Sequence, residues 1–159
     1  MKYPNLVVLI DSICEAYDLY TKPPFLHTPY TYCNLCVNFI AVRMGFWGFT
    51  NSKGMPPVLV ANDIVKTMTE AQASGWELLD GATAQLAANT GFLVVAGQKG
   101  EPHGHVAVVR PGNMVESSKW MKLVPKVLNI GKTNFIDKGV NFAFDEEPEY
   151  FWLRGEWKL

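Results

Sequence analysis

The sequence lacks the features of several large protein classes. No hydrophobic run is long enough to span a bilayer. The short apolar run from Leu6 to Ile10 is interrupted by Asp11 and no small-residue cleavage site follows it, so we expect neither membrane insertion nor a signal peptide. Only three cysteines are present, an odd number that favours reduced thiols over a disulfide framework. These absences predict a chain that is made in the cytoplasm.

The chain also has little excess charge of either sign. Its 14 Lys and Arg residues are scattered and face 15 Asp and Glu residues, which gives a formal net charge of −1. Without a basic cluster, nothing in the charge pattern predicts binding to nucleic acid or to an anionic membrane. Hydrophobic residues make up 48% of the 159 residues, which is sufficient for one sizeable core. We therefore predict a single domain over residues 1–159.

Helical patterns occupy the first half of the chain and strand patterns the second. Apolar spacing and breaker residues predict helices over 5–20, 33–44, from Asn62 or Asp63 to about 73, and 82–88. Short apolar runs between Gly and Pro residues then predict strands over 92–96, 106–109, 123–130, 140–144 and 150–154. Helices followed by strands are typical of an α+β fold, with the helices packed on one face of an antiparallel sheet.

A cysteine and a histidine stand where a thiol nucleophile and its base are expected. Cys33 begins the helix predicted over 33–44, with Thr31 as a candidate N-cap. A helix N-terminus lowers a thiol pKa and offers N–H groups to an oxyanion. His105 opens the strand over 106–109, and Asn129 lies on the next predicted strand. Neighbouring strands can therefore place the imidazole beside an amide that orients it.

Other interpretations of the cysteines remain open. In the simplest alternative, Cys33 would be a buried thiol with no chemical role. Cys33 and Cys36 form a C-x-x-C, which also suits a redox pair, although the βαβ context of a thioredoxin-like motif is missing. With His103 and His105 the two thiols make a tetrahedral zinc set, which would point to a zinc-stabilised or purely structural interaction module. Pro102 argues against that set because it favours a loop position for His103.

Three motifs together carry a resemblance to a known family. They are Thr31-Tyr32-Cys33-Asn34-x-x-Val37, Gly104-His105-Val106-Ala107-Val108-Val109-Arg110-Pro111-Gly112, and Pro125-Lys126-Val127-Leu128-Asn129-Ile130-Gly131. In order and spacing they resemble the papain-like cell-wall hydrolases of the CHAP and NlpC/P60 type, especially compact phage or bacterial amidases. The resemblance covers roughly residues 28 to 145, and the Gly-His strand is its most specific part.

The resemblance implies a papain-like fold and a thiol mechanism. Cys33 would attack a carbonyl, His105 would act as general base and acid, and Asn129 would orient the imidazole. Backbone N–H groups at the helix start would stabilise the oxyanion, helped by Tyr32 and Asn34. Asn134 or Glu116 remain alternatives for the orienting role. No cofactor and no metal is implied.

The implied substrate is an amide of peptidoglycan. The bond is either the link from muramic acid to alanine or one within the stem peptide, and the site of action is the cell wall after release by a pore or injection by a secretion system. An injected toxin would have a cognate inhibitor protein as a further partner. The same thiol chemistry also permits a protease or deamidase that acts on protein, because fold and catalytic residues do not fix the substrate.

Overall fold

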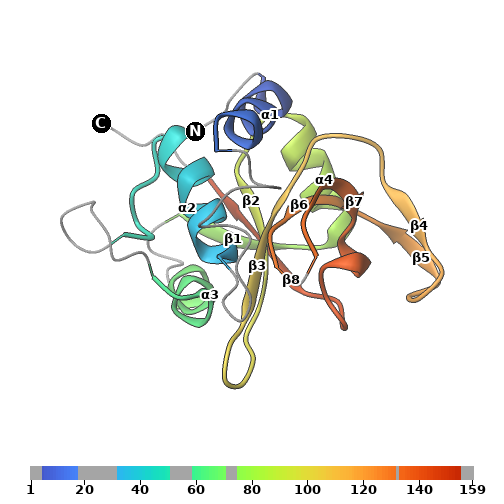
Figure 1. The fold of residues 1–159 in the computed structure, drawn as a ribbon. Helices are drawn as coiled ribbons and strands as arrows, with labels where there is room; N and C mark the ends of the chain where they lie inside the picture. The colour runs from blue at the N-terminus through green and yellow to red at the C-terminus, as the bar shows by residue number, and fades with distance from the viewer. Residues whose placement is uncertain (1–4, 18–31, 51–58, 71–74, 132, 155–159) are drawn as a thin grey trace.

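The chain folds as an α+β protein in which helices flank an antiparallel sheet (Figure 1). The computed structural model describes residues 5–17, 32–50, 59–70, 75–131 and 133–154. Within these ranges the helices are α1 (Leu6–Tyr17), α2 (Cys33–Arg43), α3 (Ala61–Glu70) and α4 (Gly81–Asn89). The first three lie on one side of the sheet and α4 lies on the other.

Glycine and aspartate determine where α2 and α4 end or begin. Gly45 has φ +88°, a left-handed conformation that ends α2 and lets Phe46 N–H donate back to the Ala41 carbonyl at 2.8 Å. Asp80 caps the start of α4, because its Oδ1 accepts from the Thr83 N–H at 2.9 Å. These are the local signals that make the ends of both helices readable from the sequence.

The main sheet has the strand order β1-β8-β2-β3-β6-β7. Its strands are β1 (Trp76–Leu79), β2 (Val94–Gln98), β3 (His105–Val109), β6 (Lys126–Asn129), β7 (Phe135–Gly139) and β8 (Glu149–Leu153). Every strand pair in the described part of the chain is antiparallel. A separate ribbon of β4 (Val115–Ser117) and β5 (Lys122–Val124) extends beside β7. The predicted pairing of β2 with β3 is confirmed.

Two hydrophobic clusters lie on the two faces of this sheet. The first cluster joins the apolar residues of α1, α2 and α3 to Val106, Val108 and Leu128, and it includes Cys33. The second cluster joins alanines of α4 to the alternate residues of the same strands, such as Ala107, and to residues of β5 and β7. Strands β2, β3 and β6 are therefore buried on both faces, which explains why they are continuous apolar runs in the sequence.

Several sequence-based expectations about the elements are wrong. The helices do not all pack on one face, because α4 covers the second face. The strand expected over 123–130 is two strands, β5 and β6, since Pro125 lacks the N–H that a continuous ladder requires. The segment expected as a strand over 140–144 is a turn of 3-10 helix over Val140–Phe142. Strands β1, β4 and β7 were not predicted.

The caps predicted for α2 and α3 also need correction. Helix α3 begins at Ala61, so Asn62 and Asp63 lie inside its first turn instead of capping it. The Asn62 side chain bonds the β2–β3 loop, donating to the Gly100 carbonyl at 2.9 Å and accepting from the Gly100 N–H at 3.1 Å. Tyr32 occupies the N-cap of α2 and makes no side-chain cap hydrogen bond. Thr31 lies outside the described residues.

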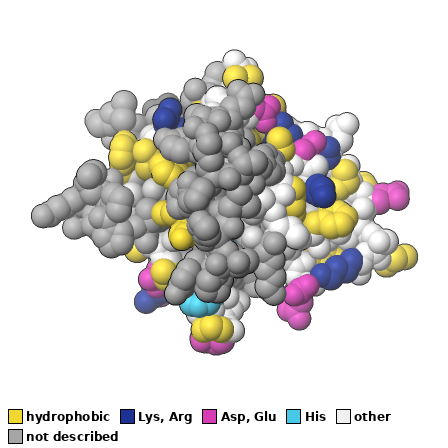
Figure 2. Space-filling model, viewed as in Figure 1, with side chains coloured by type: hydrophobic (Ala, Val, Ile, Leu, Met, Phe, Trp, Pro, Cys, Tyr) yellow, Lys and Arg dark blue, Asp and Glu magenta, His cyan; other side chains and the backbone are white. Residues whose placement is uncertain are grey.

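The surface carries charges of both signs. Figure 2 shows Lys and Arg side chains interspersed with Asp and Glu on one face, with hydrophobic side chains between them. Such mixing produces no extended field of one sign on this face. None of the helices in the described ranges combines the length and the hydropathy that a membrane span requires.

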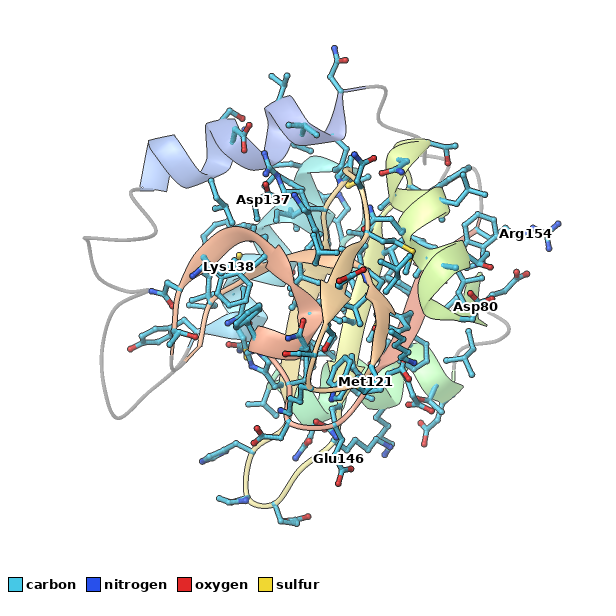
Figure 3. All side chains as sticks on the ribbon, turned by 90° about the vertical axis from the view of Figure 1, so that its right-hand side faces the viewer. Asp80, Met121, Asp137, Lys138, Glu146 and Arg154 are labelled. Carbon is cyan, nitrogen blue, oxygen red and sulfur yellow. The ribbon has the colours of Figure 1, made fainter. Side chains whose placement is uncertain are left out.

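Met121, labelled in Figure 3, has a strained backbone at the turn between β4 and β5. Its φ is +54° and its side chain is 87% exposed, so packing does not compensate for the left-handed conformation. We predict that Met121→Gly raises the free energy of unfolding by about 1 kcal/mol, measured by urea denaturation. Glu116→Gly, at an exposed strand position of the same ribbon, should lower it. A loss of stability in Met121→Gly would contradict the assignment of strain.

Candidate active site

The structure brings His105 and Asn129 into direct contact. His105 is the first residue of β3, and Asn129 is the last residue of the adjacent β6. The imidazole Nε2 lies 2.6 Å from Asn129 Oδ1, within hydrogen-bond distance. The Asn129 side chain is 2% exposed, and its Nδ2 donates to the Thr133 carbonyl at 2.7 Å. Both ends of the amide are therefore held.

This arrangement determines which imidazole nitrogen carries the proton. A backbone carbonyl only accepts, so Thr133 requires the NH₂ end of the Asn129 amide and leaves Oδ1 facing His105. An amide oxygen also only accepts, so Nε2 of His105 must carry a hydrogen. In the neutral imidazole Nδ1 is then unprotonated and available as a base.

Two residues that the sequence did not single out confine the imidazole. A Cβ placed on Gly131 would lie 3.0 Å from His105 Cε1, so the missing side chain makes room for the ring. The Phe144 ring packs against the imidazole, with ring centroids 4.9 Å apart and planes inclined by 56°. Gly131 belongs to the sequence motif around Asn129. Its place beside His105 depends on the pairing of β6 with β3, which the sequence does not show. Phe144 carries no sequence signal because it follows an irregular turn.

The surroundings lower the pKa of His105 below its ordinary value of 6.5. Burial is the larger cause, since it disfavours the charged imidazolium, and the hydrogen bond to Asn129 opposes it. The side chain is nevertheless partly exposed. A neutral imidazole with an unprotonated Nδ1 at neutral pH has the protonation state that a general base requires.

Cys33 stands at the N-terminus of α2, where Tyr32 makes no side-chain cap hydrogen bond. It is the first residue of the helix and is 4% exposed. The first intrahelical bond is donated by Cys36 N–H to the Tyr32 carbonyl, so Cys33 lies in the first turn, at the positive end of the helix dipole. Tyr32 is partly buried and packs against the first cluster. The dipole at this end of α2 favours a thiolate on Cys33.

Cys33 and His105 are anchored to the same short segment. Asn34 Nδ2 donates to the Leu59 carbonyl at 3.0 Å, which ties the start of α2 to the residues before α3. Asn62, in the first turn of α3, holds the loop that leads to His105. The Asn34 side chain, which the sequence suggested for the oxyanion site, therefore fixes the start of α2 through this bond. Cys33 and His105 therefore lie toward the same end of the sheet.

The two residues approach that end from different faces of β3. Helix α2 packs on the Val106 and Val108 face, and Cys33 belongs to that cluster. The alternation along the strand assigns His105 to the opposite face, with Ala107 and Val109, where it contacts Phe144. A thiol and an imidazole placed in this way would have to meet around the end of β3, where the strand and its side-chain alternation stop.

The structure also gives the positions of the other residues considered for the site. Asn134 Oδ1 accepts from Gly131 N–H at 3.1 Å and so closes the turn after β6. Glu116 is exposed on the β4–β5 ribbon. Cys36 is a buried thiol, 3% exposed, within the first cluster. The proposed zinc set of Cys33, Cys36, His103 and His105 does not converge: among the described residues no three His, Cys, Asp or Glu side chains are placed to hold a metal.

The sequence was also compared with known proteins. It matches no protein-family model and no curated protein.

The hydrogen bond to Asn129 predicts a defined response of the His105 pKa. In the wild type we expect the Nε2–H tautomer and a midpoint below 6.5, measured from the imidazole ¹⁵N shifts as pH is varied. Asn129→Ala should lower the midpoint further, because it removes the interaction that raises the pKa. Asn129→Asp should raise it through the added negative charge. An Nδ1–H tautomer in the wild type would refute the arrangement.

The same pKa predicts how stability depends on pH. The unfolded chain binds the His105 proton more readily than the folded chain, so this residue's contribution to stability is fully present above pH 6.5. It is lost as pH falls through the lower folded pKa. The loss should be smaller in His105→Gln, measured as the difference between urea unfolding free energies on the two sides of that range. Equal losses in both proteins would contradict the lowered pKa.

Gly131 offers a test of the space around the imidazole. Gly131→Ala would place a methyl carbon 3.0 Å from His105 Cε1, so we expect the ring to shift and the hydrogen bond to Asn129 to weaken. The His105 midpoint should then fall, because that bond raises its pKa. Gly81→Ala, whose Cβ would meet Pro125 at 3.3 Å, is the matched control and should leave the imidazole signals unchanged. Unchanged signals in Gly131→Ala as well would show that the ring is not confined there.

Proposed function

We propose that the protein is a papain-like thiol hydrolase that cleaves an amide bond of peptidoglycan. The observation that carries the proposal is the oriented His105–Asn129 pair, which presents an unprotonated Nδ1 at the end of the sheet toward which the start of α2 also points. A histidine of this protonation state near a cysteine at a helix N-terminus is the arrangement that activates a thiol. The substrate class comes from the resemblance of the three motifs to cell-wall hydrolases.

In the proposed mechanism Nδ1 of His105 takes the proton of the Cys33 thiol, and the thiolate attacks the carbonyl carbon. The negative charge that develops on the carbonyl oxygen is stabilised by the N–H groups at the start of α2. The imidazolium then protonates the leaving amine and an acyl-thioester remains on Cys33. His105 removes a proton from water, which attacks the thioester and restores the thiol. Asn129 holds the ring in one tautomer throughout.

Peptidoglycan is the preferred substrate because the motifs that surround all three residues resemble those of enzymes acting on the cell wall. The chain would then reach the wall by release through a pore or by injection. Only a protein delivered by injection would have a cognate inhibitor protein as a partner. A protease or deamidase acting on protein would use the same residues and is distinguished by its products.

Digestion of purified sacculi tests the proposal. We expect the wild type to release fragments whose masses identify the cleaved amide bond. Cys33→Ala should release none, His105→Ala should be slower by about 10²–10⁴-fold, and Asn129→Ala should show a smaller loss because the base remains but its tautomer is no longer fixed. Circular dichroism confirms that each variant is folded.

Cys36→Ala is the matched control for Cys33→Ala. Both thiols are buried on α2, but Cys36 lies one turn inside the helix, so its removal should leave fragment release close to the wild-type rate. Intact sacculi together with cleavage of protein substrates would overturn the substrate and keep the thiol chemistry. Fragment release that persists in Cys33→Ala would overturn the mechanism.

A further inference from the structure

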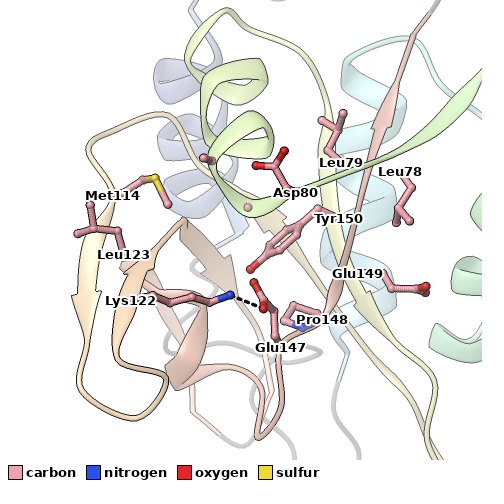
Figure 4. A pocket seen from close by; sticks show the side chains of 12 residues that line it. Leu78, Leu79, Asp80, Met114, Lys122, Leu123, Glu147, Pro148, Glu149 and Tyr150 are labelled. Carbon is pink, nitrogen blue, oxygen red and sulfur yellow. Dashed lines mark hydrogen bonds and ion pairs between the residues drawn. The ribbon is translucent and has the colours of Figure 1, made fainter.

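A cleft lies on the face of the sheet that α4 covers. It has a volume of about 640 Å³, within the range of small-ligand sites, and three chain segments form most of its wall: the start of α4, strand β5 and the start of β8 (Figure 4). Much of that wall is aliphatic, from Leu79, Leu123 and Pro148. Leu123 is 55% exposed, so an apolar side chain stands open to solvent there.

A buried hydroxyl without a partner faces this cleft. Tyr150 is 2% exposed, and its hydroxyl makes no hydrogen bond in the described part of the chain. Figure 4 shows that the hydroxyl points toward Lys122 and Glu147 in the cleft. Strand pairing with Leu79 and Ala96 fixes the backbone of Tyr150 on both sides, and its ring is buried in the second cluster. Leaving such a group unsatisfied costs about 1–3 kcal/mol, which a ligand that bonds the hydroxyl would recover.

The charges around the hydroxyl favour a cation. Asp80, Glu147 and Glu149 line the cleft, against a single ammonium on Lys122, which pairs with Glu147. Burial raises the pKa of Tyr150, and the Glu147 charge raises it further, so the residue is a neutral phenol whose oxygen accepts a hydrogen bond. The bonds from Thr83 lower the pKa of Asp80, which keeps its carboxylate ionised. An anionic ligand would face a net negative wall.

We propose that this cleft binds a primary alkyl ammonium, of the kind that a lysine side chain in a peptide carries. The methylene stem would lie against Leu79 and Leu123, and the ammonium would donate to the Tyr150 oxygen and to the Glu147 carboxylate. Three donors on one ammonium match the several oxygen acceptors of the cleft. A sugar fits less well, since among the described residues Tyr150 is the sole aromatic that lines the cleft and its ring is buried. The site does not depend on the proposed hydrolase.

Amide chemical shifts of the full-length protein measure this binding. Titration with Nα-acetyl-lysine amide should give saturable shifts at Gly81, Ala82 and Leu123, which line the cleft. Nα-acetyl-norleucine amide has the same stem without the ammonium and should bind at least tenfold more weakly. Equal affinity for the two ligands, or no saturable shift with the lysine compound, would overturn the proposal.

Two variants separate the hydroxyl from the charge. Tyr150→Phe keeps the ring in the second cluster and removes only the unpartnered oxygen, so the protein should remain folded and bind the lysine compound about tenfold more weakly. Glu147→Gln should also weaken binding, whereas Glu70→Gln, on the exposed side of α3, should leave it unchanged. Wild-type affinity in Tyr150→Phe would show that the hydroxyl is not part of a site.

Discussion

The hydrogen bond between His105 and Asn129 is the interaction on which the account of this protein depends. Its direction is determined by a third group, the Thr133 carbonyl, because that carbonyl can only receive the amide NH₂. From this follow the protonation of Nε2 and the basicity of Nδ1. Phe144 and the missing side chain of Gly131 keep the ring in place, and burial keeps it neutral.

The position of the site is a consequence of a sheet that is buried on both faces. Helix α2 and Cys33 belong to one cluster, and the alternation of β3 assigns His105 to the other. A strand of this kind separates the two side chains along its length but not at its end. His105 is the first residue of β3, and the start of α2, which carries Cys33, is tied to Leu59 just before α3. The proposed reaction would therefore take place at the rim of the sheet.

The sequence predicted the elements whose signals are local. The runs that became β2 and β3, the glycine after α2 and the start of that helix were all readable, and the strand adjacent to His105 was placed correctly. What it did not predict depends on tertiary context. The face covered by α4, the ribbon of β4 and β5, and the packing of Phe144 on His105 follow from contacts between distant segments. The cleft at Tyr150 is of the same kind, because three separate segments build most of it.

The most direct test is the rate at which iodoacetamide alkylates Cys33 as pH is varied, with mass spectrometry to resolve Cys33 from Cys36. In the wild type the thiol should react at neutral pH, because His105 accepts its proton. In His105→Ala the profile should move toward that of an ordinary thiol, with a midpoint of about 8.5. Identical profiles in the two proteins would show that the imidazole does not reach the thiol, and would contradict the proposed active site.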